Sequence, residues 1–156
     1  MILFFVNIFI LCYNTSMKKY RYLIFTILWM IFIFFMSQTP GQESSHQSSF
    51  FVDIIINFIP IKANTLSFII RKCAHMSEYA ILLFLIYQTI KNRYTLKISF
   101  FITFLYACSD EFHQLFIPGR AGQLRDVLID CTGAFIMALV IYCYKKRKHK
   151  LSNHNQ

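Results

Sequence analysis

Four long apolar segments, separated by short polar ones, run through most of the chain. They cover residues 20–37, 65–90, 97–117 and 125–144. A helix needs roughly 20 apolar residues to cross the hydrocarbon core of a bilayer, and a tilted or slightly short helix is tolerated. The pattern therefore predicts an all-α fold, a polytopic membrane bundle of four spanning helices.

A shorter apolar segment lies between the first two predicted spans. Residues 37–49 are rich in Ser and Gln and predict an aqueous loop, whereas residues 50–61 are apolar but interrupted by Asp53 and closed by Pro60. A segment this short cannot cross the core, but it can lie in the membrane interface. We therefore expect a short interfacial helix between spans 1 and 2.

The N-terminal region contains an apolar extension, residues 1–16, that is too short to span. Met17 is followed at once by basic residues, so we expect translation to begin at Met17. No small-x-small cleavage pattern follows the first span, which favours an uncleaved anchor over a signal peptide. The expected organisation is a membrane domain over residues 17–144 and a basic cytoplasmic tail over residues 145–156.

Composition supports a membrane environment. Apolar residues make up 56% of the chain, above the roughly 45 to 50% of soluble domains. The five cysteines form no closely spaced pair, which argues against a disulfide framework or a zinc site. The net charge of +9 comes from clusters at the ends of apolar segments, so anionic lipid is the expected partner and nucleic acid is not.

The distribution of charge predicts the orientation. Eleven of the 16 Lys and Arg residues lie at one set of helix ends: Lys18, Lys19, Arg21, Lys91, Arg93, Lys97, Lys145, Lys146, Arg147, Lys148 and Lys150. Basic residues concentrate on the cytoplasmic side of membrane proteins, so both termini are expected in the cytoplasm if translation starts at Met17. All seven acidic residues fall in the other half, which we expect to face outside.

Polar residues of the last three predicted spans recur every three or four positions and so share a helix face. The sets are Arg71, His75 and Glu78; Asp110, His113 and Gln114; and Asp126, Asp130 and Gly133. At about 1.5 Å per residue, Glu78, Asp110 and Asp130 all lie about 20 to 22 Å above the cytoplasmic charges. Ionisable groups at such depth are rare without partners or a task. The sequence predicts one outward-facing cluster, whose mouth is ringed by Arg71, Lys72, Arg120 and Asp126.

Several stretches resemble the VanZ-like family of bacterial membrane proteins. They are RKCAHMSEYA at residues 71–80, SDEFHQLFIPGR at 109–120, DVLID at 126–130 with Gly133, and MSQTPG at 36–41, where Met36 stands in place of a common second Ser. The resemblance covers nearly all of residues 17–144. It implies a plasma-membrane protein of four helices, related to one linked to resistance to the glycopeptide teicoplanin. In some members Asn stands at the position of Asp130.

One hypothesis for the cluster is binding of an anionic lipid or a lipid-linked cell-wall intermediate. Arginine grips phosphate through paired hydrogen bonds, and several basic residues lie near the expected outer interface. The candidate ligand-binding residues are Arg71, Lys72, His75, Glu78, Asp110, Glu111, His113, Gln114, Arg120, Asp126 and Asp130.

A second hypothesis is an enzyme acting on an envelope lipid. Imidazoles and carboxylates could bind a divalent metal or act in general acid–base catalysis. The candidate residues are His75, Glu78, Asp110 and His113. The sequence has no HExxH motif, and it assigns neither a resident metal nor a cofactor.

A third hypothesis is purely structural, with buried charges that neutralise one another and hold the bundle together. The expected pairs are Arg71 or Lys72 with Glu78, and Arg120 or Arg125 with Asp126. Single residues also have ordinary roles in this interpretation. Tyr79 is expected at the membrane interface, Glu111 facing water or Lys72, and Gly133 at a close helix contact.

Overall fold

The computed structural model describes residues 18–38, 52, 62–90, 95–120 and 122–154. Four helices and no strand occur in these ranges: α2 (Lys18–Ser37), α4 (Ala63–Ile90), α5 (Thr95–Gln114) and α6 (Leu124–His154). The predicted all-α fold with four long helices is confirmed. The N-terminal extension over residues 1–16 and, except for Val52, the predicted interfacial helix over residues 50–61 lie outside the described residues.

Two helix boundaries differ from the expected spans. α5 ends at Gln114, and residues 115–119 form turns that include Pro118. Gly119, the last residue of these turns, has a φ of 73°. Proline has no amide hydrogen to continue the helix, and a positive φ suits glycine. α6 runs past residue 144 to His154, because residues 145–154 include good helix formers and contain neither Gly nor Pro. The basic tail is therefore largely helical.

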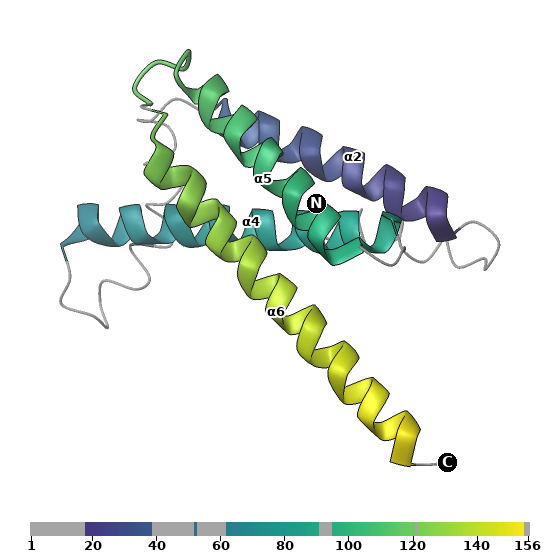
Figure 1. Cartoon of the computed structure of the whole chain (residues 1–156). Coiled ribbons are helices and arrows are strands. Elements are labelled where there is room, and N and C mark those ends of the chain that lie inside the picture. Colours follow the sequence, from purple (N-terminus) through teal and green to yellow (C-terminus); the bar gives the residue numbers. More distant parts are fainter. Residues whose placement is uncertain (1–17, 39–51, 53–61, 91–94, 121, 155–156) are drawn as a thin grey trace.

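α4 is the central helix of the bundle. It packs against α2, α5 and α6, and α5 also packs against α6. In Figure 1 the C-terminal ends of α2 and α5 lie at the same end of the molecule as the N-terminal end of α6, while the far part of α6 projects beyond the other helices. Successive helices thus run in alternating directions, as repeated crossing of a membrane requires.

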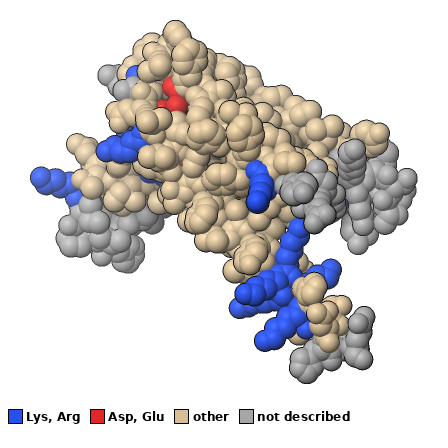
Figure 2. All heavy atoms as spheres, in the orientation of Figure 1, with Lys and Arg blue, Asp and Glu red and all other residues tan. Residues whose placement is uncertain are grey.

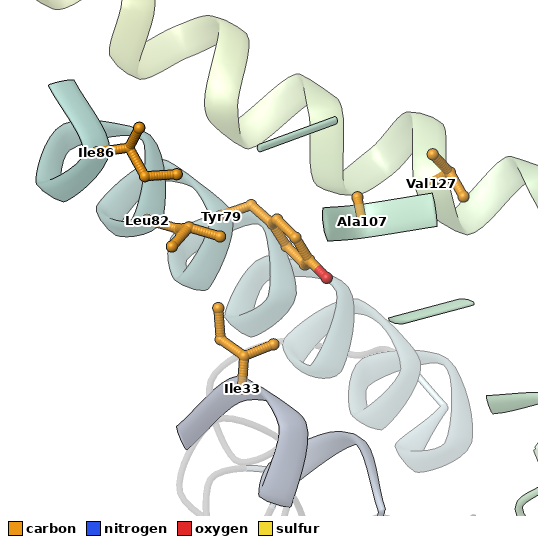
Figure 3. Packing of buried hydrophobic residues seen from close by; sticks show 6 residues of the cluster. All are labelled: Ile33, Tyr79, Leu82, Ile86, Ala107 and Val127. Atoms are coloured by element: carbon orange, nitrogen blue, oxygen red, sulfur yellow. The ribbon is translucent and has the colours of Figure 1, made fainter. Parts of the chain in front are cut away.

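The buried core draws on all four helices. Its main cluster comprises Ile33, Tyr79, Leu82, Ile86, Ala107 and Val127, which are drawn in Figure 3. Tyr79 is 0% exposed and points from α4 toward Ala107, so its expected place at the membrane interface is wrong. The ring fills the core while the hydroxyl finds a polar partner, as buried tyrosines require.

Hydrogen bonds also join α2 to its neighbours. The indole nitrogen of Trp29 donates to the backbone oxygen of Glu78 over 3.0 Å, and the hydroxyl of Tyr106 donates to the backbone oxygen of Met30 over 2.6 Å. The hydroxyls of Thr26 and Thr89 lie 3.1 Å apart. In lipid, where apolar burial drives helix association only weakly, such bonds and close packing hold helices together.

Gly133 on α6 lies directly against the backbone of α4. A Cβ atom at this position would overlap the carbonyl oxygen of Met76. The expected close packing at Gly133 is therefore present in the structure, and it brings the acidic face of α6 near His75 and Glu78 on α4.

Two of the described helices are long and apolar enough to cross a membrane, over Tyr20–Ser37 and Leu124–Asn153. Both carry large apolar side chains on their outer surfaces, including Phe35 on α2 and Leu128 and Val140 on α6. Such continuous apolar surfaces suit contact with lipid. That α4 and α5 also span the membrane stays a prediction.

Candidate functional site

The predicted site residues gather where α5 ends and α6 begins. We use the name polar cluster for Ser37, Arg71, Lys72, His75, Glu78, Tyr79, Asp110, Glu111, Gln114, Arg120, Asp126 and Asp130. Figure 2 shows Asp and Glu atoms at this end of the molecule, while Lys and Arg atoms gather on the far part of α6. The cluster thus combines side chains from all four helices and from the turn after α5.

Asp110 is the centre of the hydrogen-bonding network. Its side chain is 4% exposed, and its Oδ2 accepts hydrogen bonds from the hydroxyls of Ser37 over 2.7 Å and of Tyr79 over 3.1 Å. The side-chain amide of Gln114 donates to the same oxygen over 3.3 Å. Hydrogen bonds to a charged acceptor contribute about 1.5 to 3 kcal/mol each. This carboxylate therefore ties α2, α4 and α5 together.

An ion pair between Lys72 and Asp126 links α4 to α6. The Lys72 ammonium lies 2.6 Å from Oδ2 of Asp126. Of the two basic residues expected to pair with Glu78, Arg71 or Lys72, Lys72 pairs with Asp126 instead, and the carboxylate of Glu78 meets His75. Arg125, the neighbour of Asp126, places its guanidinium 5.9 Å from the ring centre of Phe68.

His75 and Glu78 form a pair within α4, as their spacing allows. Nδ1 of His75 lies 3.1 Å from Oε2 of Glu78. Asp130, on α6, is 3% exposed and lies near enough to interact electrostatically with His75, Glu111 and Asp110. The structure thus brings Glu78, Asp110 and Asp130 to one region, where three helices meet.

Glu111 holds the segment that precedes α6. Its Oε2 accepts a 3.0 Å hydrogen bond from the backbone amide of Gln123. The side chain is buried, so its expected position facing water is wrong, whereas Lys72, the other expected neighbour, lies near enough to interact with it electrostatically. A Cβ at Gly122 would overlap the carbonyl oxygen of Glu111, which shows how closely this segment approaches the end of α5.

Arg120 lies half-buried at the mouth of the cluster. Its Nη1 donates to the side-chain oxygen of Gln114 over 3.4 Å. Burial lowers the pKa of Arg120 from its usual value; nearby Asp110 opposes that shift, and the guanidinium of Arg71 adds to it. Arg71 and Arg120 thus share this mouth with the carboxylates of Asp110, Glu111 and Glu78, which also interact with Arg120.

His113 faces a different neighbour from the other candidates. Its ring stacks on Phe34 of α2, with centroids 4.8 Å apart and an interplanar angle of 30°. Its Nε2 is buried, with no hydrogen-bond partner among the described residues. The structure thus turns His113 toward α2, although Asp110 lies one turn earlier on the same helix.

Two members of the cluster were missed as site residues. The MSQTPG stretch contains Ser37, and its likeness to the family pattern was a usable signal. Tyr79 follows His75 by four residues and so shares its face, which was also a usable signal. Within the described ranges, no group of three or more His, Cys, Asp or Glu side chains is arranged to hold a metal ion.

Comparison with known families gives one match. The family model described as VanZ/LLP1 matches residues 22–145, which include the polar cluster and reach well into α6. Neither the curated proteins nor the solved structures give a match to the chain. The family match covers far more than half of the sequence and agrees with the two membrane-length helices. The chain belongs to the VanZ/LLP1 family, whose VanZ-like members are membrane proteins linked to glycopeptide resistance.

Proposed function

We propose that this protein is a four-span protein of the bacterial plasma membrane whose polar cluster opens to the outside. There it binds the anionic headgroup of a lipid or of a lipid-linked cell-wall precursor. Occupation of this site contributes to glycopeptide resistance of the teicoplanin type. The basic ends of the helices, including the C-terminal end of α6, lie in the cytoplasm in this arrangement.

The lengths of α4 and α5, and the burial of the acidic residues on α5, support four spans. α4 has 28 residues and α5 has 20, which correspond to about 42 and 30 Å. Asp110 and Glu111 interrupt the apolar pattern of α5, but both are buried against neighbouring helices. Charged groups inside a bundle are tolerated at membrane depth when they have partners there.

Charge supports the outward orientation. The carboxylates of the polar cluster lie at one end of the bundle, and the basic residues 145–150 lie on the far part of α6 (Figure 2). A cytoplasmic location of the basic end follows the positive-inside rule. The mouth of the cluster then faces the outer leaflet, where lipid-linked cell-wall precursors are displayed.

The proximity of Arg71 and Arg120 is the observation that carries the binding proposal. Both guanidinium groups lie at a partly exposed position, above the carboxylates of Asp110, Glu111 and Glu78 that also interact with Arg120. An anion at this mouth would receive paired hydrogen bonds from the guanidinium groups. The carboxylates below are already engaged, Asp110 by hydroxyl donors and Asp126 by Lys72. A phosphate-bearing headgroup fits this mouth best.

Catalysis is the second candidate, and the pair of His75 and Glu78 favours it. A carboxylate 3.1 Å from Nδ1 orients an imidazole, as a general base requires. The reaction in that case is hydrolysis or group transfer on an envelope lipid. If so, changing Glu78 to Gln lowers turnover and leaves lipid binding intact.

Lipid binding to the purified, detergent-solubilised protein tests the proposal. The probes are dioctanoyl phosphatidylglycerol and a short-chain polyprenyl phosphate, measured by calorimetry. Arg71→Gln and Arg120→Gln should each weaken binding about tenfold, because each removes charge-assisted hydrogen bonds. Lys148→Gln, on the exposed far part of α6, is the matched control. Equal affinity of all four proteins for both probes would overturn the proposal.

A further inference from the structure

A second surface feature lies between α5 and α6, well away from the polar cluster. It is a groove of about 620 Å³ lined by Leu96, Phe100, Phe101 and Phe104 of α5 and by Phe135 and Ala138 of α6. Lys97 completes the lining. Lys97 lies in the first turn of α5, so the groove occupies the half of the bundle opposite Asp110.

The lining indicates a hydrocarbon occupant. Apart from Lys97, every lining side chain is apolar, and most are aromatic. Phe101 and Phe135 are more than half exposed in the folded chain. The volume of the groove lies within the range of ligand pockets, roughly 300 to 1,000 Å³. Within a membrane the available occupant of such a groove is a lipid acyl chain.

Lys97 indicates the charge of that lipid. Its side chain is exposed, and no carboxylate in the described ranges forms an ion pair with its ammonium. The described acids lie on α4, on the C-terminal half of α5 and on the first turns of α6. Lys145 of α6 lies over the ring of Tyr87, on the side of α4. Among the residues that the structure describes, Lys97 is thus the one basic residue that lines this groove.

We propose that the groove holds one acyl chain of an anionic phospholipid of the cytoplasmic leaflet, with the lipid phosphate at Lys97. This site is separate from the polar cluster and lies in the opposite leaflet. A second copy of the chain suits the groove less well. A symmetric contact through this surface would bring two Lys97 ammonium groups toward each other.

The proposal is tested with full-length protein in nanodiscs of equal parts phosphatidylglycerol and phosphatidylethanolamine. The protein is released into mild detergent, and retained lipids are counted by native mass spectrometry. Lys97→Gln should lower retention of phosphatidylglycerol about fivefold, the factor expected for one cation near an anionic lipid surface. Lys148→Gln, another exposed lysine outside the groove, should change nothing.

A second pair of variants tests the apolar part of the groove. Ala138→Phe fills it and should release the retained lipid, whereas Val140→Phe adds the same ring at an exposed position outside the lining. If Ala138→Phe does not fold, Lys97→Gln alone carries the test.

Arg120→Gln changes only the polar cluster, so it should leave the lipid at Lys97 in place even if the polar cluster no longer binds its own lipid. Undiminished phosphatidylglycerol in Lys97→Gln, equal retention of phosphatidylethanolamine, or a dimer without lipid would overturn the proposal.

Discussion

The hydroxyl of Tyr79 on α4 donates a 3.1 Å hydrogen bond to Oδ2 of Asp110 on α5. Both side chains are buried, and the same carboxylate oxygen also accepts a hydrogen bond from the hydroxyl of Ser37 on α2. One acidic residue thus fixes the relative positions of three helices at the end where the polar cluster forms. A buried charge with several donors is stabilising only while those donors are present.

Tyr79→Phe should destabilise the protein by about 1 to 3 kcal/mol, because a buried carboxylate then loses one of its donors. The measurement is thermal unfolding of the purified protein, followed by circular dichroism. The control is Tyr142→Phe, which removes a hydroxyl from an exposed ring of α6. Equal unfolding temperatures for Tyr79→Phe and wild type would show that the bond to Asp110 contributes nothing.

The ion pair of Lys72 and Asp126 predicts non-additive effects. Lys72→Gln leaves a partly buried carboxylate without its partner, and Asp126→Asn leaves a partly buried ammonium without its partner. The double variant removes both charges, so its loss of stability should be smaller than the sum of the two single losses, by about 0.5 to 3 kcal/mol. A double-mutant cycle on unfolding free energies measures this coupling. Strictly additive losses would mean that the pair is not formed.

Gly133→Ala should separate α4 from α6, because the new Cβ overlaps the carbonyl oxygen of Met76. Overpacking of this kind costs about 1 to 3 kcal/mol. Abundance in membranes and unfolding temperature should both fall. Leu128→Ala, at an exposed position on the same helix, should change neither much. A Gly133→Ala protein as stable as wild type would contradict the close approach.

Helical periodicity made the all-α architecture and the gathering of the polar side chains predictable. Residues spaced three or four apart share a face whatever surrounds them, so His75 with Glu78 and Asp126 with Asp130 were grouped correctly. The choice of partners depends on how helices rotate against one another, which no single sequence specifies. For that reason Asp126 was assigned to Arg120 or Arg125, whereas its ion pair is with Lys72.

Contacts between distant segments were the other information that the sequence lacked. Ser37 and Asp110 are 73 residues apart, and nothing local to Ser37 indicates its acceptor. Tyr79 has a side chain that suits an interface or a core equally well, so its burial depended on the packing of all four helices. The last span was predicted to end at residue 144, because basic residues mark where a membrane span ends. α6 itself continues to His154, because helix propensity and not charge decides where a helix ends.

The orientation predicts which thiols are accessible in intact cells. In a background with all five cysteines replaced by Ser, Gln123→Cys should react with a membrane-impermeant thiol reagent added outside. Asn153→Cys, near the end of α6, should react only after permeabilisation, because the basic end faces the cytoplasm in the proposed orientation. Gel shift with a maleimide polymer reads out both. The reverse pattern would invert the proposed topology.

Removal of the charge of Arg120, with membrane abundance measured in parallel, tests most directly whether the polar cluster is a binding site. Cells lacking the protein are complemented with wild type, Arg120→Gln or Lys148→Gln, and teicoplanin susceptibility is measured together with membrane abundance. We predict that Arg120→Gln accumulates normally and fails to restore resistance, whereas Lys148→Gln restores it. Full resistance with Arg120→Gln at normal abundance would contradict a binding role for the cluster.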